Sequence, residues 1–140
     1  MRAVVIYESL RGHTAKAAEL IGQHLVSGGV SATVCPTTEV DYQAVADADL
    51  VVVGSWTDGL FFFAQKPARA ARLSALPVLN GKTCAVFCTF ALDPGKTIDK
   101  LSALMTERGA DVIGGMSIRR DDLESGSKEF AERLLGVVAA

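Results

Sequence analysis

Residues 3–14 read AVVIYESLRGHT, a continuous apolar run that passes through a polar loop into a helical pattern. The run Ala3–Tyr7 shows no alternation of polar and apolar residues, which is typical of a strand covered on both faces of a sheet. The segment Thr14–Ser27 then places its apolar residues on one helical face. A buried strand followed directly by an amphipathic helix predicts a βα unit, the building block of α/β domains with a parallel sheet.

The same pattern recurs along the whole chain. Further valine-rich strands are predicted at Ser31–Cys35, Leu50–Gly54, Thr83–Thr89 and Asp111–Ile118. Helices are predicted near Tyr42–Ala48 and Pro67–Leu76, at Lys96–Arg108 and at about Ser125–Val138. Five strands with short connections in 140 residues predict one α/β domain, residues 1–140, with a parallel sheet of order 2-1-3-4-5 and helices on both faces. An eight-stranded barrel needs about 250 residues and is excluded.

The composition excludes several classes of protein. Hydrophobic residues make up 49% of the chain and charged residues 21%, which excludes disorder. No apolar run approaches the roughly 18 residues of a membrane span. The formal net charge of −2 provides no general attraction to nucleic acid or to an anionic membrane.

The 3 cysteines form no CxxC pair and no cluster with the histidines, which excludes a zinc site and a disulfide framework. Unpaired thiols and the absence of a secretory signal pattern predict the reducing cytoplasm. Cys84 and Cys88 lie four residues apart in one predicted strand, so we expect both to be buried on the same face. Cys88 lies close enough to the end of that strand for its oxidation to matter to a ligand there.

Ligands of such sheets bind beyond the carboxyl ends of the strands, so the loops after Tyr7, Gly54 and Thr89 form the candidate site. The first loop places two hydroxyls, a basic side chain and a glycine within the segment Ser9, Leu10, Arg11, Gly12, His13, Thr14. A phosphate at the start of the next helix gains from free backbone N–H groups, from the helix dipole and from hydroxyl donors. Ordinary helix capping is the alternative interpretation.

The second loop contains the only tryptophan, in the segment Ser55, Trp56, Thr57, Asp58, Gly59. A large aromatic side chain at the ligand edge can stack on a planar heterocycle, because flat rings bury area at little entropic cost. The alternative is a hydrophobic lid that includes Phe61–Phe63 and packs over the core.

The third loop contains Gly95-Lys96-Thr97, a fragment that occurs in nucleotide-binding P-loops. That motif also needs a glycine five positions before Gly95, where this chain has Phe90, so an NTPase is excluded. Asp93 instead predicts a turn that caps the following helix.

These loops resemble those of the flavodoxins. The phosphate loop of that family runs Thr/Ser-x-Thr/Ser-Gly-x-Thr, and Ser9, Gly12 and Thr14 match it. Arg11 stands where the family usually has a second hydroxyl, and it supplies a charged donor that suits a dianion. The resemblance covers essentially the whole chain and implies a three-layer, flavodoxin-like sandwich of the short-chain type with FMN as cofactor.

The resemblance also implies which residues contact FMN. The ring is expected between Trp56 and the loop around Phe90, with the Asp58-Gly59 peptide at its edge. The full set of expected FMN contacts is Ser9, Leu10, Arg11, Gly12, His13, Thr14, Ser55, Trp56, Thr57, Asp58, Gly59, Thr89, Phe90, Ala91, Leu92 and Gly95.

Between Gly59 and Leu92 the chain has no acidic residue, whereas Lys66, Arg69 and Arg72 follow one another at helical spacing. This basic stripe departs from the acidic surface that is typical of electron-carrying flavodoxins. It suits the docking of an acidic redox partner, the attraction of NAD(P)H phosphates, or an ordinary solvated helix face.

The expected function is that of an FMN-binding electron carrier, which shuttles electrons between a reductase and an acceptor protein. Two alternatives remain open. One is an FMN-dependent NAD(P)H reductase that acts on a small molecule. The other is a flavin-free, flavodoxin-like interaction domain that uses Phe61–Phe63 and the basic stripe as a protein contact.

Overall fold

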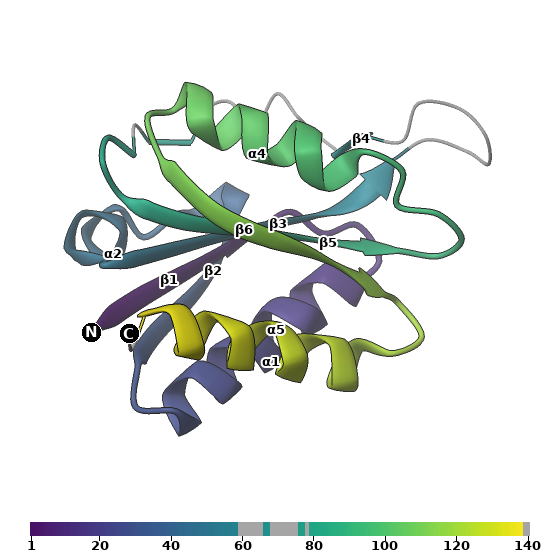
Figure 1. The fold of residues 1–140 in the computed structure, drawn as a ribbon, viewed down its shortest axis with the longest axis horizontal. Helices are drawn as coiled ribbons and strands as arrows, with labels where there is room; N and C mark the ends of the chain where they lie inside the picture. Colours follow the sequence, from purple (N-terminus) through teal and green to yellow (C-terminus); the bar gives the residue numbers. More distant parts are fainter. Residues whose placement is uncertain (59–65, 68–75, 78, 139–140) are drawn as a thin grey trace.

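The computed structural model describes residues 1–58, 66–67, 76–77 and 79–138. Strands and helices alternate along the chain, as predicted (Figure 1). The elements are β1 (Arg2–Tyr7), α1 (His13–Ser27), β2 (Ser31–Pro36), the short 3-10 helix η1 (Thr37–Glu39), α2 (Tyr42–Asp47), β3 (Leu50–Asp58), β4 (Lys66–Pro67), β5 (Thr83–Phe90), α4 (Thr97–Glu107), β6 (Asp111–Arg119) and α5 (Leu123–Val138). Among the described helices, none combines the length and the apolar character that a membrane crossing requires.

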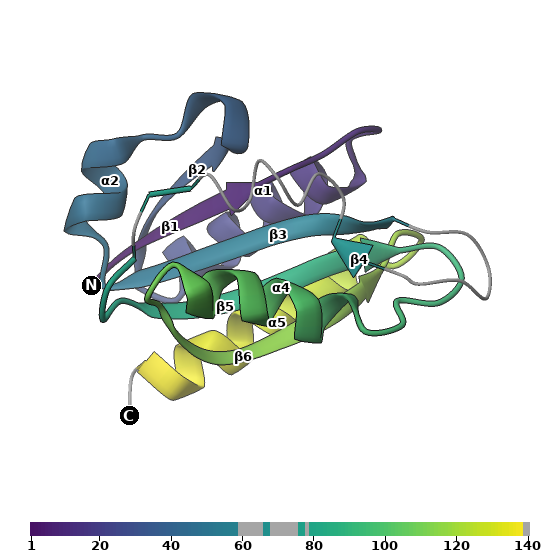
Figure 2. The same ribbon diagram turned by 90° about the horizontal axis from the view of Figure 1, so that it is seen from above.

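Five parallel strands form the central sheet in the order β2-β1-β3-β5-β6, which confirms the predicted order 2-1-3-4-5. β1 lies between β2 and β3, and its residue Val5 is in register with Val34 on one side and Val52 on the other. The short strand β4 pairs antiparallel with the end of β3 and lies off this path. Figure 2 shows β1, β3 and β5 running side by side through the middle of the molecule.

Both faces of the sheet are covered by helices. On one face, Val5, Val52 and Phe87 belong to a buried cluster that includes residues of α1 and α5. On the other face, Val4 and Val53 belong to a second cluster that includes residues of α2 and α4. Figure 1 shows α1 and α5 together on one side of the sheet and α4 on the opposite side. The central strands β1, β3 and β5 are buried on both faces, as their apolar sequences predicted, whereas most residues of the edge strands β2 and β6 are half-buried or exposed.

β3 is longer than the sequence predicted. Its apolar run ends at Gly54, but the strand continues to Asp58, so residues 55–58 are not a loop. Ser55 and Trp56 stay in register with Cys88 and Thr89 of β5, and Thr57 pairs with Pro67 of β4. Pairing with neighbouring strands therefore extends β3 beyond its hydrophobic segment.

Two predicted features at helix starts are wrong. Pro67 lies in β4 and not in a first helical turn, and the rest of the helix predicted near Pro67–Leu76 lies almost entirely outside the described residues. Asp93 does not cap α4: its carboxylate accepts the N–H of Gly95 at 2.9 Å, and α4 begins after Lys96 without a side-chain cap. Asp93 therefore shapes the turn that precedes the helix.

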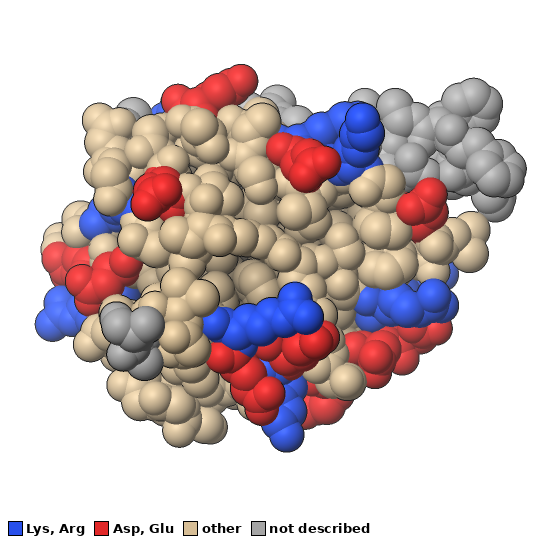
Figure 3. All heavy atoms as spheres, in the orientation of Figure 1, with Lys and Arg blue, Asp and Glu red and all other residues tan. Residues whose placement is uncertain are grey.

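Acidic and basic side chains are mixed over the face of the molecule shown in Figure 3. They lie mainly around its margin, and neutral side chains fill the middle. This mixture agrees with the small net charge of −2 and leaves no broad field of one sign on this face.

Gly54 allows close packing between β3 and β5. A Cβ atom at this position would overlap the ring of Phe87, which is fully buried. We expect the substitution Gly54→Ala to lower the free energy of unfolding by about 1–3 kcal/mol, because the overpacked ring has no room to move.

Urea unfolding followed by circular dichroism measures this effect. Gly136→Ala is the matched control, because position 136 is exposed in α5 with no atom within 4 Å of an added Cβ. The control is expected to keep or slightly raise the stability, since alanine favours helix over glycine by up to about 1 kcal/mol. Equal stabilities of the two variants would contradict the packing argument.

Candidate functional site

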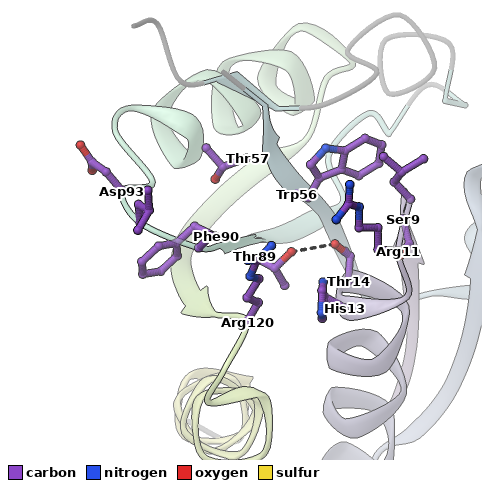
Figure 4. Close-up of a pocket in the computed structure, with 13 residues that line it drawn as sticks. Ser9, Arg11, His13, Thr14, Trp56, Thr57, Thr89, Phe90, Asp93 and Arg120 are labelled. Carbon is purple, nitrogen blue, oxygen red and sulfur yellow. Dashed lines mark hydrogen bonds between the residues drawn. The ribbon is translucent and has the colours of Figure 1, made fainter. Parts of the chain in front are cut away.

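The three predicted loops meet at the carboxyl edge of the sheet and enclose one cavity of about 350 Å³ (Figure 4). Its walls come from the segment after β1, the end of β3, the segment after β5 and the residue that follows β6. The lining residues are Ser9, Leu10, Arg11, His13, Thr14, Trp56, Thr57, Thr89, Phe90, Ala91, Leu92, Asp93 and Arg120. Most of the predicted site residues therefore lie around a single hollow.

The start of α1 forms the polar end of the cavity. Gly12 precedes the helix with φ = 92°, a left-handed conformation that glycine adopts at no steric cost. The Ser9 hydroxyl accepts the N–H of Gly12 at 3.2 Å, and no side chain caps the helix. Ordinary capping therefore does not explain this loop. The N–H groups of the first helical turn have no partner within the helix and can bind an anion.

A hydrogen bond links this loop to the third one. Thr14 Oγ1 lies 2.8 Å from Thr89 Oγ1, and the two residues are only 1% and 2% exposed. One hydroxyl donates to the other, so one of the two protons stays available for another acceptor. The bond fixes α1 against β5 at the floor of the cavity.

Basic side chains exceed acidic ones around the cavity. Arg11, Arg120 and the imidazole of His13 line it, and Asp93 is the one carboxylate among the lining residues in the described part of the chain. Arginine binds planar or tetrahedral oxyanions through paired N–H donors. The charge and the open helix start together favour an anionic group at this end.

Apolar side chains form the rest of the wall. Trp56 and Phe90 are half-buried and lie on different sides of the Thr14–Thr89 bond in Figure 4. Leu10 and Leu92 line the rim with 62% and 71% of their surface exposed. A cavity with aromatic walls and a polar end suits a planar ring system that carries a charged tail.

Gly12, Ser55 and Gly95 are predicted contacts that do not line the cavity. Ser55 is fully buried in β3, with its hydroxyl 3.4 Å from the Trp56 carbonyl oxygen. Gly95 lies in the turn before α4 with φ = 52°. Only the backbone of Asp58 is described, where it pairs with β4, and Gly59 lies outside the described residues.

Two residues beside the cavity were missed from the sequence. Arg120 follows the fifth parallel strand at the same edge of the sheet, and the adjacent basic pair after β6 was the available signal. Glu8 follows β1 directly and is 2% exposed; its carboxylate accepts the hydroxyl of Thr37, and its N–H donates to the Gly54 carbonyl at 2.9 Å. Glu8 thus ties the first loop to β3 and η1.

The chain belongs to the flavodoxin domain family, because the model of that family matches residues 4–118. Solved structures agree in fold. Flavodoxin 2 from Bacillus cereus is 21% identical to this chain with a TM-score of 0.74, and the match covers 100% of both chains. A flavodoxin from Streptococcus pneumoniae TIGR4 is 21% identical with a TM-score of 0.72, covering 98% of this chain and 99% of its own.

A flavodoxin from the domain Archaea has a TM-score of 0.68 at 23% identity and covers 96% of this chain and 99% of its own. A comparison with curated protein sequences gave no significant match. FMN is the cofactor of the flavodoxin family, and electron transfer is its general activity. The cavity fits this cofactor, because its uncapped helix start and arginines suit the phosphate and its aromatic walls suit the ring.

Cys88 lies beside the cavity, and all three cysteines are buried. Cys84 and Cys88 are both fully buried, and burial raises the pKa of the Cys84 thiol to about 12. Burial also raises the pKa of Cys88, although its hydrogen bonds to Ser117 and Thr57 act in the opposite direction. Cys88 therefore touches the cavity residue Thr57 without being accessible to an oxidant.

We expect all three thiols to resist modification in the folded protein. The pKa of Cys35 is raised by burial as well, so at pH 8 a smaller fraction of each cysteine is ionised to thiolate than in a free cysteine. For Cys84 this fraction is only about one in ten thousand. Labelling with iodoacetamide, followed by mass spectrometry, should modify none of them within the time that modifies all three in guanidinium chloride. Rapid labelling of Cys88 in the folded state would contradict this.

Proposed function

We propose that this protein is an electron carrier of the short-chain flavodoxin type, which binds FMN in the cavity and passes electrons between a reductase and an acceptor protein. The observation that carries the proposal is the meeting of three loops in one cavity, with a cationic, uncapped helix start on one side and two aromatic side chains along the walls. The family match over residues 4–118 supports it.

The first loop would hold the phosphate. Arg11 supplies a charged donor, and the N–H groups of His13 and Thr14 lie in the first turn of α1, where the helix dipole favours negative charge. Gly12 provides the left-handed backbone conformation, φ = 92°, with which the loop enters the helix. The Ser9 hydroxyl already accepts the Gly12 N–H, so its own proton is available for a phosphate oxygen.

The ring would lie against Trp56 and Phe90, with Thr57, Ala91 and Leu92 around it. When bound, FMN supplies the one- and two-electron chemistry. The chain's own residues hold the ring, exclude water from its faces and set the dielectric around it, so no side chain has to act as a nucleophile or a general acid. Ser55, Asp58, Gly59 and Gly95 remain part of the proposed site through their backbone.

The partner would approach at the exposed rim. Leu10 and Leu92 present apolar surface beside the cavity, and such surface is buried when a partner docks. We further propose that the basic stripe contributes to docking, although Arg69 and Arg72 lie outside the described residues, as does the side chain of Lys66. Three free cysteines support a reducing compartment such as the cytoplasm.

The visible absorption spectrum of the purified protein tests the cofactor proposal. The protein should show the absorption bands of bound flavin, either as isolated or after incubation with excess FMN and removal of the unbound flavin. A protein that stays colourless after both treatments contradicts FMN binding and favours the interaction-domain alternative. Oxidation of NAD(P)H by the flavin-loaded protein without a partner would favour the reductase alternative over the carrier.

Trp56 provides a second test, because it is the only tryptophan in the chain. FMN bound against it should quench its fluorescence. Trp56→Ala should weaken FMN binding by roughly two- to tenfold, because an aromatic stack contributes about 0.5–1.5 kcal/mol, whereas Trp56→Phe should retain most of the affinity. Flavin fluorescence measures the affinity of these variants.

Tyr42→Ala is the matched control, since Tyr42 is 69% exposed and does not line the cavity. An equal loss of FMN affinity in this control would contradict a stacking role for Trp56.

A further inference from the structure

One basic side chain of the cavity lies outside the region that defines the family. Arg120 lines the cavity, but the family match ends at residue 118. We propose that Arg120 is a second anchor for the flavin phosphate, which acts together with Arg11 and makes the site selective for phosphorylated flavin over riboflavin. This inference rests on the proposed function, because it requires FMN in the cavity.

The backbone holds Arg120 at the edge of the site. β6 stays in register with β5 up to the pair Phe90 and Arg119, and the Arg120 N–H then donates to the Phe90 carbonyl at 2.9 Å. Arg120 is therefore attached directly to the third loop of the cavity. In Figure 4 its side chain extends toward Thr89, on the side of the cavity where the Thr14–Thr89 bond lies. Arg11 lies on the other side of Thr14 in the same view.

The guanidinium group of Arg120 has no bonded partner among the described residues. Within these ranges, Arg120 forms neither an ion pair nor a side-chain hydrogen bond. The nearby carboxylate of Asp121 is bound by Arg119 at 3.1 and 3.3 Å, and this hydrogen bond is the main reason why the pKa of Asp121 is lowered. The N–H donors of Arg120 are therefore available to a ligand.

The charges around the cavity match a dianion. A phosphate monoester carries about −1.5 to −2 charges at pH 7, and the guanidinium groups of Arg11 and Arg120 together supply two positive charges. Among the lining residues that the structure describes, Asp93 is the single carboxylate, and it offsets part of this excess. Riboflavin has no phosphate, so it would leave both guanidinium groups without a counter-ion. Binding energy from Arg120 is thus gained by FMN alone.

The test compares the dissociation constants of FMN and riboflavin, measured by quenching of Trp56 fluorescence. Arg120→Gln should weaken FMN binding about tenfold or more, since a hydrogen bond to a charged group contributes at least about one decade of affinity. Riboflavin binding should change less than about twofold. Arg120→Lys should lie between the wild type and the glutamine variant, because lysine keeps the charge but loses the paired donors.

Arg133→Gln is the matched control. It removes the same charge from an exposed side chain of α5 that pairs with Glu129 and does not line the cavity. Its FMN affinity should stay within about threefold of the wild type. Thermal unfolding without ligand confirms that each variant is folded.

The outcomes separate this inference from the proposed function. Loss of FMN affinity in Arg120→Gln that riboflavin does not share, and that Arg133→Gln does not reproduce, supports the anchor. An unchanged FMN affinity in Arg120→Gln, or an equal loss for both ligands or both arginine variants, overturns the anchor and leaves the proposed function intact. A wild type that binds neither flavin overturns both.

Discussion

The site exists because β1 and β5, the strands on either side of β3, send their chains to opposite faces of the sheet. β1 leads into α1, which packs on one face, whereas β5 leads into α4 on the other. In a sheet with right-handed crossovers, such a reversal separates the loops at the carboxyl edge and leaves a crevice between them. Here the hydrogen bond between Thr14 and Thr89 closes the floor of that crevice. The position of the cavity therefore follows from the strand order, and the side chains only determine what it can bind.

The polar end of the cavity depends on a helix whose start is left without a cap. Gly12 occupies the N-cap position and has no side chain to cap α1, and the Ser9 hydroxyl accepts the N–H of Gly12 and so stabilises the left-handed turn. Glycine in place of a capping side chain costs about a few tenths of a kcal/mol of stability. Such a cost is typical of a binding site, because a ligand can satisfy the same N–H groups. The loop is thus arranged for an anion at some expense to the stability of the free protein.

The sequence predicted the parts of this structure that depend on local patterns. Buried strands, amphipathic helices and the glycine before α1 leave a signal within a few residues, and the strand order follows from general rules of handedness. The extension of β3 to Asp58 was not predicted, because it depends on pairing with β4 and β5 and not on its own apolar content. Arg120 was missed for the same reason: only the folded sheet brings the end of β6 beside the loop after β5. Tertiary contacts determine both features.

The local charge of the cavity opposes the charge of the whole protein. The formal net charge is −2, so at long range the protein does not attract an anion. At physiological ionic strength, fields are screened over about 8 Å, so a phosphate inside the cavity interacts mainly with the groups that line it. Within the described ranges, those groups are two arginines, a histidine and an open helix start, against one carboxylate. The cavity can therefore hold a dianion although the protein as a whole is not basic. Its selectivity for the anion is determined by the groups that line the cavity, and not by the net charge.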